Sequence, residues 1–402
     1  MLVKKCQLCQ SPEIRTVIDL GEHPLADTFL SEDMLQSEEP RYPLKVFLCQ
    51  SCGYAGLEYV VPAERRYQET DYSYTSGNSP VSLKHFSDLA EQVSGQLGLA
   101  DQELVVDIGS NDGTLLKAFR DRTGCRIVGV EPSANIAALA HKNNLPTVQS
   151  FFDGPTVERI ISKYGQARCV LATNVFNHSS NPGDFVSNVA KLLDDRGVFI
   201  FEVPYWLTLV NQYSFDTIYL EHVSYFAVKP LVNFFNKYNL HITDIKEIDY
   251  MGGSIRVTVS KMPSNDVLIA RFIKREEAAD LYNFRTYEDF MDKINSLKKD
   301  LVEQLQAAKA RGEKVIGIGA ATKGNTLLNF CGITNDLIDF VTDSSPQKIG
   351  KYTPGSRLPI KADDAITNDV KYAVILPWNI ADFLMGKLKF LNLKFIIPHI
   401  NQ

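Results

Sequence analysis

Two C-x-x-C motifs, far apart in the sequence, constrain the fold of this chain more than any other feature. Their thiols belong to Cys6 and Cys9 in the first motif and to Cys49 and Cys52 in the second. The two-residue spacing lets both thiolates of a motif turn inward on one tight loop, and two such loops form a closed tetrahedral zinc site. The amino-terminal part of the chain is therefore expected to fold around a structural Zn²⁺. Four protein ligands leave no open position for a catalytic zinc.

A redox-active thiol pair is the alternative interpretation of a C-x-x-C motif. Redox motifs usually lie where a strand meets a helix, and neither motif here lies in such a pattern. The three other cysteines, Cys125, Cys169 and Cys331, lie in or near apolar runs and are expected in the core.

The composition is that of a soluble globular enzyme with more than one domain. The chain has 402 residues, of which 45% are hydrophobic and 22% charged, and its formal net charge is -6. This length predicts two or three domains, and the negative charge argues against a nucleic-acid partner. The chain starts without an apolar leader and has no run of about 18 apolar residues, so we expect a cytoplasmic protein without a membrane partner. We expect a monomer or a small homo-oligomer.

From about residue 80 onward, the pattern changes to alternating helices and strands. A helix is predicted from Ser82 toward Leu97, because apolar residues recur there with helical spacing. Buried parallel strands are predicted at Leu104–Ile108, Ile127–Val130, Val170–Ala172 and Val198–Val203, with helices between them. This alternation is typical of a doubly wound α/β sheet. An antiparallel strand pair is expected to close the unit, at Ile242–Ile248 and Ile255–Ser260.

A second, smaller α/β unit is expected at the carboxyl end. Residues 264–312 are charged and predict two connecting helices, the second ending at Gly312. Strands are predicted at Val315–Ile318, Leu337–Val341, Tyr372–Leu376 and Phe395–Pro398, and a helix at Thr322–Phe330. The predicted fold class is α/β, with a zinc-binding domain at 1–80, a Rossmann-like domain at 81–262, and a helical connector with a smaller Rossmann-like domain at 263–402.

The turn after the first strand of the middle domain has the chemistry of an S-adenosylmethionine site. Its glycines let the backbone approach a ligand where a helix begins. A dinucleotide fingerprint would read G-x-G-x-x-G, whereas the carboxylates of Asp107 and Asp112 repel a pyrophosphate and suit a cationic methionine group. The next strand ends in Glu131, whose carboxylate can bind both ribose hydroxyls. The expected donor contacts are Asp107, Gly109, Asn111, Asp112, Gly113, Glu131, Pro132, Ser133 and Asn174. A turn without a ligand is the alternative.

Two groups of polar side chains are candidates for catalysis. His178 follows the fourth strand, at the carboxyl edge where α/β folds bind ligands. A phenol, a carboxylate and an imidazole stand close together at Tyr219, Glu221 and His222, a set that can relay a proton and stabilise an oxyanion. Tyr74 lies in a hydroxyl-rich segment at the predicted domain boundary. A packing histidine, a polar surface turn and an ordinary linker are the respective alternatives.

The last domain carries a second glycine turn with a different charge. Gly319, Lys323 and Asn325 lie between a predicted strand and a helix, in a turn that contains a lysine and no carboxylate. This chemistry suits phosphate, although the Gly-Lys-Ser/Thr ending of a P-loop is missing. We expect the domain to bind a nucleotide diphosphate, and a purely structural turn is the alternative.

Taken together, these motifs resemble the bacterial C-methyltransferases that act on nucleotide-linked keto-deoxysugars, of the dTDP-sugar 3-C-methyltransferase type. The resemblance spans nearly the whole chain. It implies a structural zinc, and a sugar nucleotide bound between the middle and last domains. It also implies that Tyr74, His178, Tyr219, Glu221 and His222 surround the sugar. The family often has His-Gly-Gly-Ser where this chain has Met251-Gly252-Gly253-Ser254, a departure that bears on which sugar is the substrate.

The predicted reaction is methyl transfer from S-adenosylmethionine to a sugar carbon. A keto group acidifies the neighbouring C–H, and His222, assisted by Glu221, is the expected base. Tyr74, Tyr219 or His178 is expected to stabilise the enolate oxygen. Methylation of oxygen or nitrogen, a nicotinamide-dependent oxidoreductase using Gly317–Gly324, and a non-catalytic zinc scaffold are the alternatives.

Overall fold

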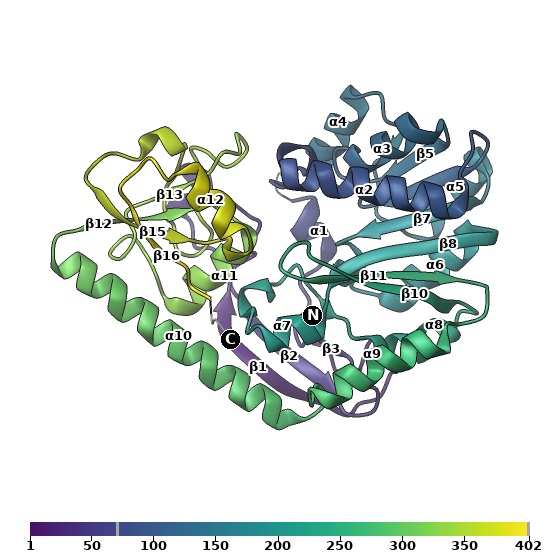
Figure 1. Cartoon of the computed structure of the whole chain (residues 1–402), viewed down its shortest axis with the longest axis horizontal. Helices are drawn as coiled ribbons and strands as arrows, with labels where there is room; N and C mark the ends of the chain where they lie inside the picture. Colours follow the sequence, from purple (N-terminus) through teal and green to yellow (C-terminus); the bar gives the residue numbers. More distant parts are fainter. Residues whose placement is uncertain (70–71, 400–402) are drawn as a thin grey trace.

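The computed structural model describes residues 1–69 and 72–399 and arranges their strands in three sheets. The two α/β units form separate lobes, and the amino-terminal strands, drawn in purple, lie between and below them (Figure 1). The division into domains at 1–80, 81–262 and 263–402 stays a prediction. Within the described residues, no helix is both long and apolar enough to cross a membrane.

The amino-terminal sheet has four antiparallel strands, and one of them comes from the middle of the chain. Its order is β1 (Ile14–His23), β2 (Tyr42–Cys49), β3 (Ala55–Leu57) and β9 (Ser224–Tyr225). Ala55 pairs with Tyr225, and the Leu57 amide donates to the Val223 carbonyl at 2.9 Å. The zinc-binding region is therefore joined by backbone hydrogen bonds to the segment that directly follows His222.

The middle sheet has seven strands in the order β10-β11-β8-β7-β4-β5-β6. The predicted parallel strands are confirmed as β4 (Leu104–Ile108), β5 (Arg126–Val130), β7 (Ala167–Thr173) and β8 (Leu193–Pro204), with β6 (Thr147–Val148) at the edge. The antiparallel closure is confirmed as β10 (His241–Ile248) and β11 (Ser254–Ser260). This arrangement brings the carboxyl ends of β4, β5 and β7 to one edge, where α/β folds bind ligands.

Helices cover both faces of this sheet. Side chains alternate along each strand, so Val105 packs with α2 (Pro80–Leu97) and α3 (Thr114–Thr123), while Val106 faces the opposite core. The other helices of this region are α4 (Ala134–Lys142), α5 (Gly154–Tyr164), α6 (Pro182–Leu192), α7 (Trp206–Asn211) and α8 (Val228–Asn236), and α1 (Ala63–Tyr67) precedes them. Cys125, Cys169 and Cys331 are buried, as expected.

Two helices lead to the last unit, as predicted. They are α9 (Asp266–Ala278) and α10 (Phe284–Ala310), which runs along the outside of the molecule from one lobe to the other (Figure 1). The last sheet is parallel, in the order β14-β13-β12-β15-β16. Its strands are β12 (Lys314–Ile318), β13 (Val341–Thr342), β14 (Ile360–Lys361), β15 (Val370–Ile375) and β16 (Lys394–Ile396), with helices α11 (Thr322–Cys331) and α12 (Ala381–Lys387).

The strand predicted at Leu337–Val341 is wrong in its extent. The Leu337 and Ile338 amides both donate to the Thr334 carbonyl at 3.1 Å, so the first part of this apolar run is a turn. The strand begins only at Val341. Burial alone produces an apolar run, whether the backbone is extended or turned.

Candidate functional site

The four predicted zinc ligands converge. Their sulfur atoms all lie within 4.8 Å of one another. The Sγ atoms of Cys6 and Cys52 are 3.6 Å apart, as are those of Cys9 and Cys49. Sulfurs at about 2.3 Å from a tetrahedral zinc are separated by about 3.8 Å. The cluster therefore has the ligand type and spacing of a structural zinc site.

The glycine turn after β4 is shaped for close backbone approach. Gly109 has φ +64°, and a Cβ there would lie 2.4 Å from the Val175 side chain. Glu131 accepts hydrogen bonds from the Asn111 amide at 3.1 Å and the Ser133 amide at 2.8 Å. The carboxylate at the end of β5 is thereby fixed against the turn at the end of β4.

Asp107 supplies an unsatisfied acceptor at the same place. Its side chain is buried, and among the described residues its Oδ1 atom has no hydrogen-bond partner. Burial, and secondarily the neighbouring Glu131, raises the pKa of Asp107 well above its usual value. A cationic ligand would relieve both the missing contact and the repulsion, so the turn fits the sulfonium and amino groups of S-adenosylmethionine.

The carboxylate of Asp112, a predicted donor contact, has partners within the protein. It accepts hydrogen bonds from the Gly77 amide at 2.8 Å and from the hydroxyl of Thr114 at 2.6 Å. Asn111 likewise accepts from the Ser76 amide at 2.9 Å. The turn thus holds residues 76–77 beside the predicted donor site.

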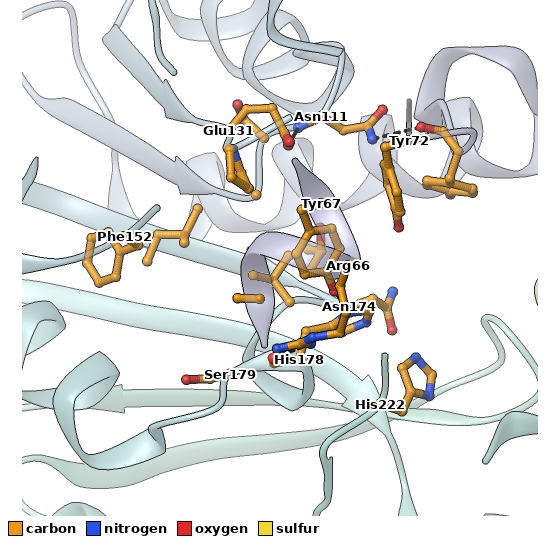
Figure 2. Close-up of a pocket in the computed structure, with 18 of the residues that line it drawn as sticks. Arg66, Tyr67, Tyr72, Asn111, Glu131, Phe152, Asn174, His178, Ser179 and His222 are labelled. Carbon is orange, nitrogen blue, oxygen red and sulfur yellow. Dashed lines mark hydrogen bonds between the residues drawn. The ribbon is translucent and has the colours of Figure 1, made fainter. Parts of the chain in front are cut away.

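A single cavity of about 720 Å³ connects this turn to the last domain. Its size is typical of ligand pockets. The predicted site residues that line it are Tyr74, Asp107, Gly109, Asn111, Glu131, Pro132, Asn174, His178, Tyr219, His222 and Lys323. The other predicted site residues in these domains, Asp112, Gly113, Ser133, Glu221, Gly319 and Asn325, are not part of its lining. In the view of Figure 2, Tyr67 lies between Glu131 and Asn111 on one side and His178 and His222 on the other.

Tyr219 and His222 form a hydrogen-bonded pair on the cavity wall. The Nδ1 atom of His222 lies 2.9 Å from the Thr217 carbonyl, so this nitrogen carries the proton. The Nε2 atom then accepts the Tyr219 hydroxyl at 2.6 Å. Burial lowers the pKa of His222 to about 3, and Lys323 contributes in the same direction. The imidazole is therefore neutral, and the lone pair of its Nε2 atom accepts the hydrogen of the Tyr219 phenol.

The expected assistance of His222 by Glu221 is not what the structure shows. Both imidazole nitrogens are taken by Tyr219 and Thr217, while Oε1 of Glu221 accepts the Asp27 amide at 3.0 Å. Burial, and next the charge of Asp27, raises the pKa of Glu221 to about 8. Glu221 and His222 are adjacent in a turn, and their side chains point to different partners.

His178 stands at right angles to His222, with ring centroids 4.8 Å apart. The hydroxyl of Tyr67 is hydrogen-bonded to Nδ1 of His178. Burial, then His222 and Arg66, lowers the pKa of His178 well below its usual value. Both histidines are thus neutral donors and acceptors in this wall.

Arg66 links the loop that contains His178 to the loop that contains His222. Its guanidinium donates to the carbonyls of His178 at 3.0 Å and Glu221 at 3.3 Å, and to the Ser180 hydroxyl at 2.8 Å. Sequence reasoning missed Arg66, Tyr67 and Asp27, which line the cavity together with Tyr72 and Lys348. No spacing or motif marks Arg66, Tyr67 or Asp27, although Tyr67 precedes the hydroxyl-rich segment that contains Tyr72 and Tyr74.

The last domain contributes two lysines. Lys323 is the second residue of α11, and its ammonium group donates to the Met251 carbonyl at 3.3 Å. The Lys348 ammonium group donates to the Ala320 carbonyl at 2.8 Å. Burial lowers the pKa of Lys323, an effect that the charge of Asp216 opposes. These cationic groups lie on the wall of the same cavity as Glu131.

Three family models match successive parts of the chain. Residues 6–67 match a zinc binding domain, residues 84–245 a methyltransferase domain, and residues 249–398 a C-methyltransferase C-terminal domain. The chain is 31% identical to the C-methyltransferase NovU of Streptomyces niveus, over 98% of this chain and 95% of that protein. A ubiquinone biosynthesis O-methyltransferase of Rhodopseudomonas palustris is 34% identical over 24% of this chain and 38% of its own length.

A solved S-adenosylmethionine-dependent methyltransferase from Clostridium acetobutylicum matches 44% of this chain and 91% of its own, with 14% identity and a TM-score of 0.36. The assignment does not depend on this likeness. Full-length identity to NovU and the three domain matches decide against the oxidoreductase and scaffold alternatives. The chain belongs to the family of S-adenosylmethionine-dependent C-methyltransferases with an amino-terminal zinc-binding domain.

Proposed function

We propose that the protein methylates a carbon atom of a nucleotide-linked keto-deoxysugar, with dTDP as the nucleotide, through an enolate. The observation that carries this proposal is the single cavity. It joins the acidic turn at Asp107 to the lysine-bearing wall at Lys323, with the Tyr219–His222 pair also in its lining.

Different parts of the cavity lining suit different ligands. Asp107 and Glu131 suit the cationic methionine group and the ribose of the methyl donor. Lys323 and Lys348 suit a diphosphate, and Lys323 lies in the first turn of α11, where backbone amides also favour anions. When bound, S-adenosylmethionine supplies a methyl group on a sulfonium, which is a good leaving group.

Tyr219 and His222 transfer a proton in the proposed reaction. In the proposed step, the C–H next to the keto group breaks and its proton moves to the Tyr219 oxygen, while the phenolic proton moves to Nε2 of His222. The pair is arranged for this relay, because the Thr217 carbonyl keeps Nε2 free to accept. Lys323 lies close enough to His222 to affect its pKa and favours the negative charge of the enolate.

In this proposal, His178 donates a hydrogen bond to the enolate oxygen, in addition to the favourable charge of Lys323. Its ring faces His222, and Tyr67 occupies its Nδ1 atom, which leaves Nε2 for the substrate. Tyr74 lines the cavity farther from this pair, since its hydroxyl lies with Ser82 and Tyr250. We therefore assign Tyr74 to packing against the reactants rather than to proton transfer.

Product analysis tests the proposal. The zinc-loaded protein is incubated with S-adenosylmethionine and a dTDP-linked keto-deoxyhexose, and the product is examined by mass spectrometry and by carbon NMR. A new C–C methyl group next to the keto carbon is expected. A methyl group on oxygen or nitrogen would contradict the proposal and identify the protein as an O- or N-methyltransferase.

A further inference from the structure

Asp27 brings a carboxylate from the zinc-binding region into the wall of the cavity. Asp27 is 8% exposed, and it lines the cavity together with Tyr72, Tyr219 and Lys348. It lies in the loop after β1, in a part of the chain otherwise concerned with the zinc site. Nothing in the reaction described above uses this group.

The backbone around Asp27 is held by both other units. Its amide donates to Glu221 at 3.0 Å, and the preceding Ala26 carbonyl accepts the Asn325 side chain at 2.7 Å. The Thr322 hydroxyl donates to Oδ1 of Asp27. The carboxylate is therefore fixed in position by contacts with the middle domain and with α11.

This carboxylate has acceptor capacity beyond its protein partners. An ionised carboxylate offers about four acceptor positions. Thr322 fills one, and the Tyr72 hydroxyl lies near the same group. Burial raises the pKa of Asp27, against which Thr322, Lys348 and Tyr72 stabilise the charged form. A further donor from a ligand would satisfy the remaining positions.

The position of Asp27 identifies the part of the ligand that it meets. A carboxylate repels a diphosphate, so the phosphates belong with the lysines. The charge of Asp27 acts directly on Tyr219, the phenol of the proposed proton relay. Asp27 and Tyr219 also line the same cavity, so we place the carboxylate beside the reacting ring, at the border with Lys348.

We propose that Asp27 is a substrate-binding residue whose carboxylate accepts a hydrogen bond from a hydroxyl group of the sugar ring, next to Tyr219. This inference rests on the proposed function, since it takes the substrate to be a sugar nucleotide. It makes the zinc-binding region part of the substrate site. A purely structural link between Asp27 and Thr322 is the competing explanation.

Ligand binding separates the two explanations without relying on turnover. Calorimetry on the zinc-loaded full chain, with S-adenosylhomocysteine present, measures Kd for dTDP and for dTDP-glucose, which differ only by the sugar and its phosphate linkage. Asp27→Asn keeps an acceptor for Thr322 and removes the charge. It is expected to raise Kd for dTDP-glucose by about 10- to 100-fold, with Kd for dTDP within about threefold of wild type.

Thr322→Val is the matched variant for the structural explanation, because it removes the link and keeps the carboxylate. A structural link predicts that both variants change the two affinities in the same proportion, and that result would overturn the inference. An unchanged affinity of Asp27→Asn for dTDP-glucose would overturn it while leaving the proposed function intact. A wild type that binds neither ligand would overturn both. If Asp27→Asn does not fold, Asp27→Ser is measured instead, with the same selective loss expected.

Discussion

Tyr219 donates its hydroxyl to Nε2 of His222 across 2.6 Å, because the Thr217 carbonyl has fixed the other imidazole nitrogen as a donor. The pair is thus a preset path for one proton rather than two independent side chains. Both residues line the cavity that connects the donor turn to the last domain.

Removing either member of this pair is expected to impair C–H exchange and methylation together. In deuterated water, one position next to the keto group of a dTDP-linked keto-deoxyhexose should take up deuterium, with S-adenosylhomocysteine in the donor site. His222→Ala should abolish both activities, because it removes the final proton acceptor. Tyr219→Phe should slow both by about 10²–10³-fold. Exchange that survives His222→Ala and is lost in Glu221→Gln would transfer the role of base to the carboxylate.

Loss of zinc is expected to affect the site as well as stability, because β3 pairs with β9 just beyond His222. Purified protein should contain about one zinc per chain. Cys49→Ser should lower the metal content and lower Tm by more than about 10 °C. Cys331→Ala, a buried cysteine away from the cluster, should keep the zinc. Metal-free protein with normal Tm and activity would rule out a structural role.

Glu131→Ala should weaken S-adenosylmethionine binding by about 10- to 100-fold, because it removes both the ribose acceptor and the anchor of the Asn111 amide. Calorimetry measures this. Asp343→Ala is a close control, since Asp343 accepts the Ala320 and Ser345 amides in the same way but lies outside the cavity wall. If both variants bind the donor like wild type, the ribose assignment is wrong.

Lys323→Ala should weaken dTDP binding by about tenfold and leave S-adenosylmethionine affinity nearly unchanged, because it removes a cation that the last domain contributes to the cavity wall. Lys361→Ala, which changes an exposed lysine of the same domain, should leave both affinities unaltered. A selective loss of donor affinity in Lys323→Ala would mean that the two ligand positions are reversed.

Glu221 should make the protein less stable as the pH rises. Its pKa is raised by burial from an ordinary 4.5 to about 8, so between these values the folded state binds more protons than the unfolded state. Stability from this group is complete below the lower value, declines as the pH rises toward 8, and is constant above. Glu221→Gln should therefore flatten the fall in Tm between about pH 5 and pH 9. Parallel Tm profiles for wild type and variant would contradict this.

Local patterns in the sequence determined the parts of this protein whose chemistry lies within one turn. The C-x-x-C spacing predicted the zinc cluster, and the alternation of strands and helices predicted the middle sheet. The acidic glycine turn at Asp107–Gly113, together with Glu131, predicted a donor site. Each C-x-x-C motif and the glycine turn consist of residues within a few positions of one another, where backbone geometry leaves few choices.

The tertiary structure alone decided which side chains meet. Asp27 and Arg66 carry no motif, yet packing of three units brings them to one cavity with Glu131 and Lys323. Glu221 precedes His222 directly, but the partner of its carboxylate is the amide of Asp27, 194 positions away. Gly319 and Asn325 lie in the expected turn, but outside the cavity wall. A cavity is formed by contacts between distant segments, and those contacts depend on how whole sheets and helices pack, which short spacings do not encode.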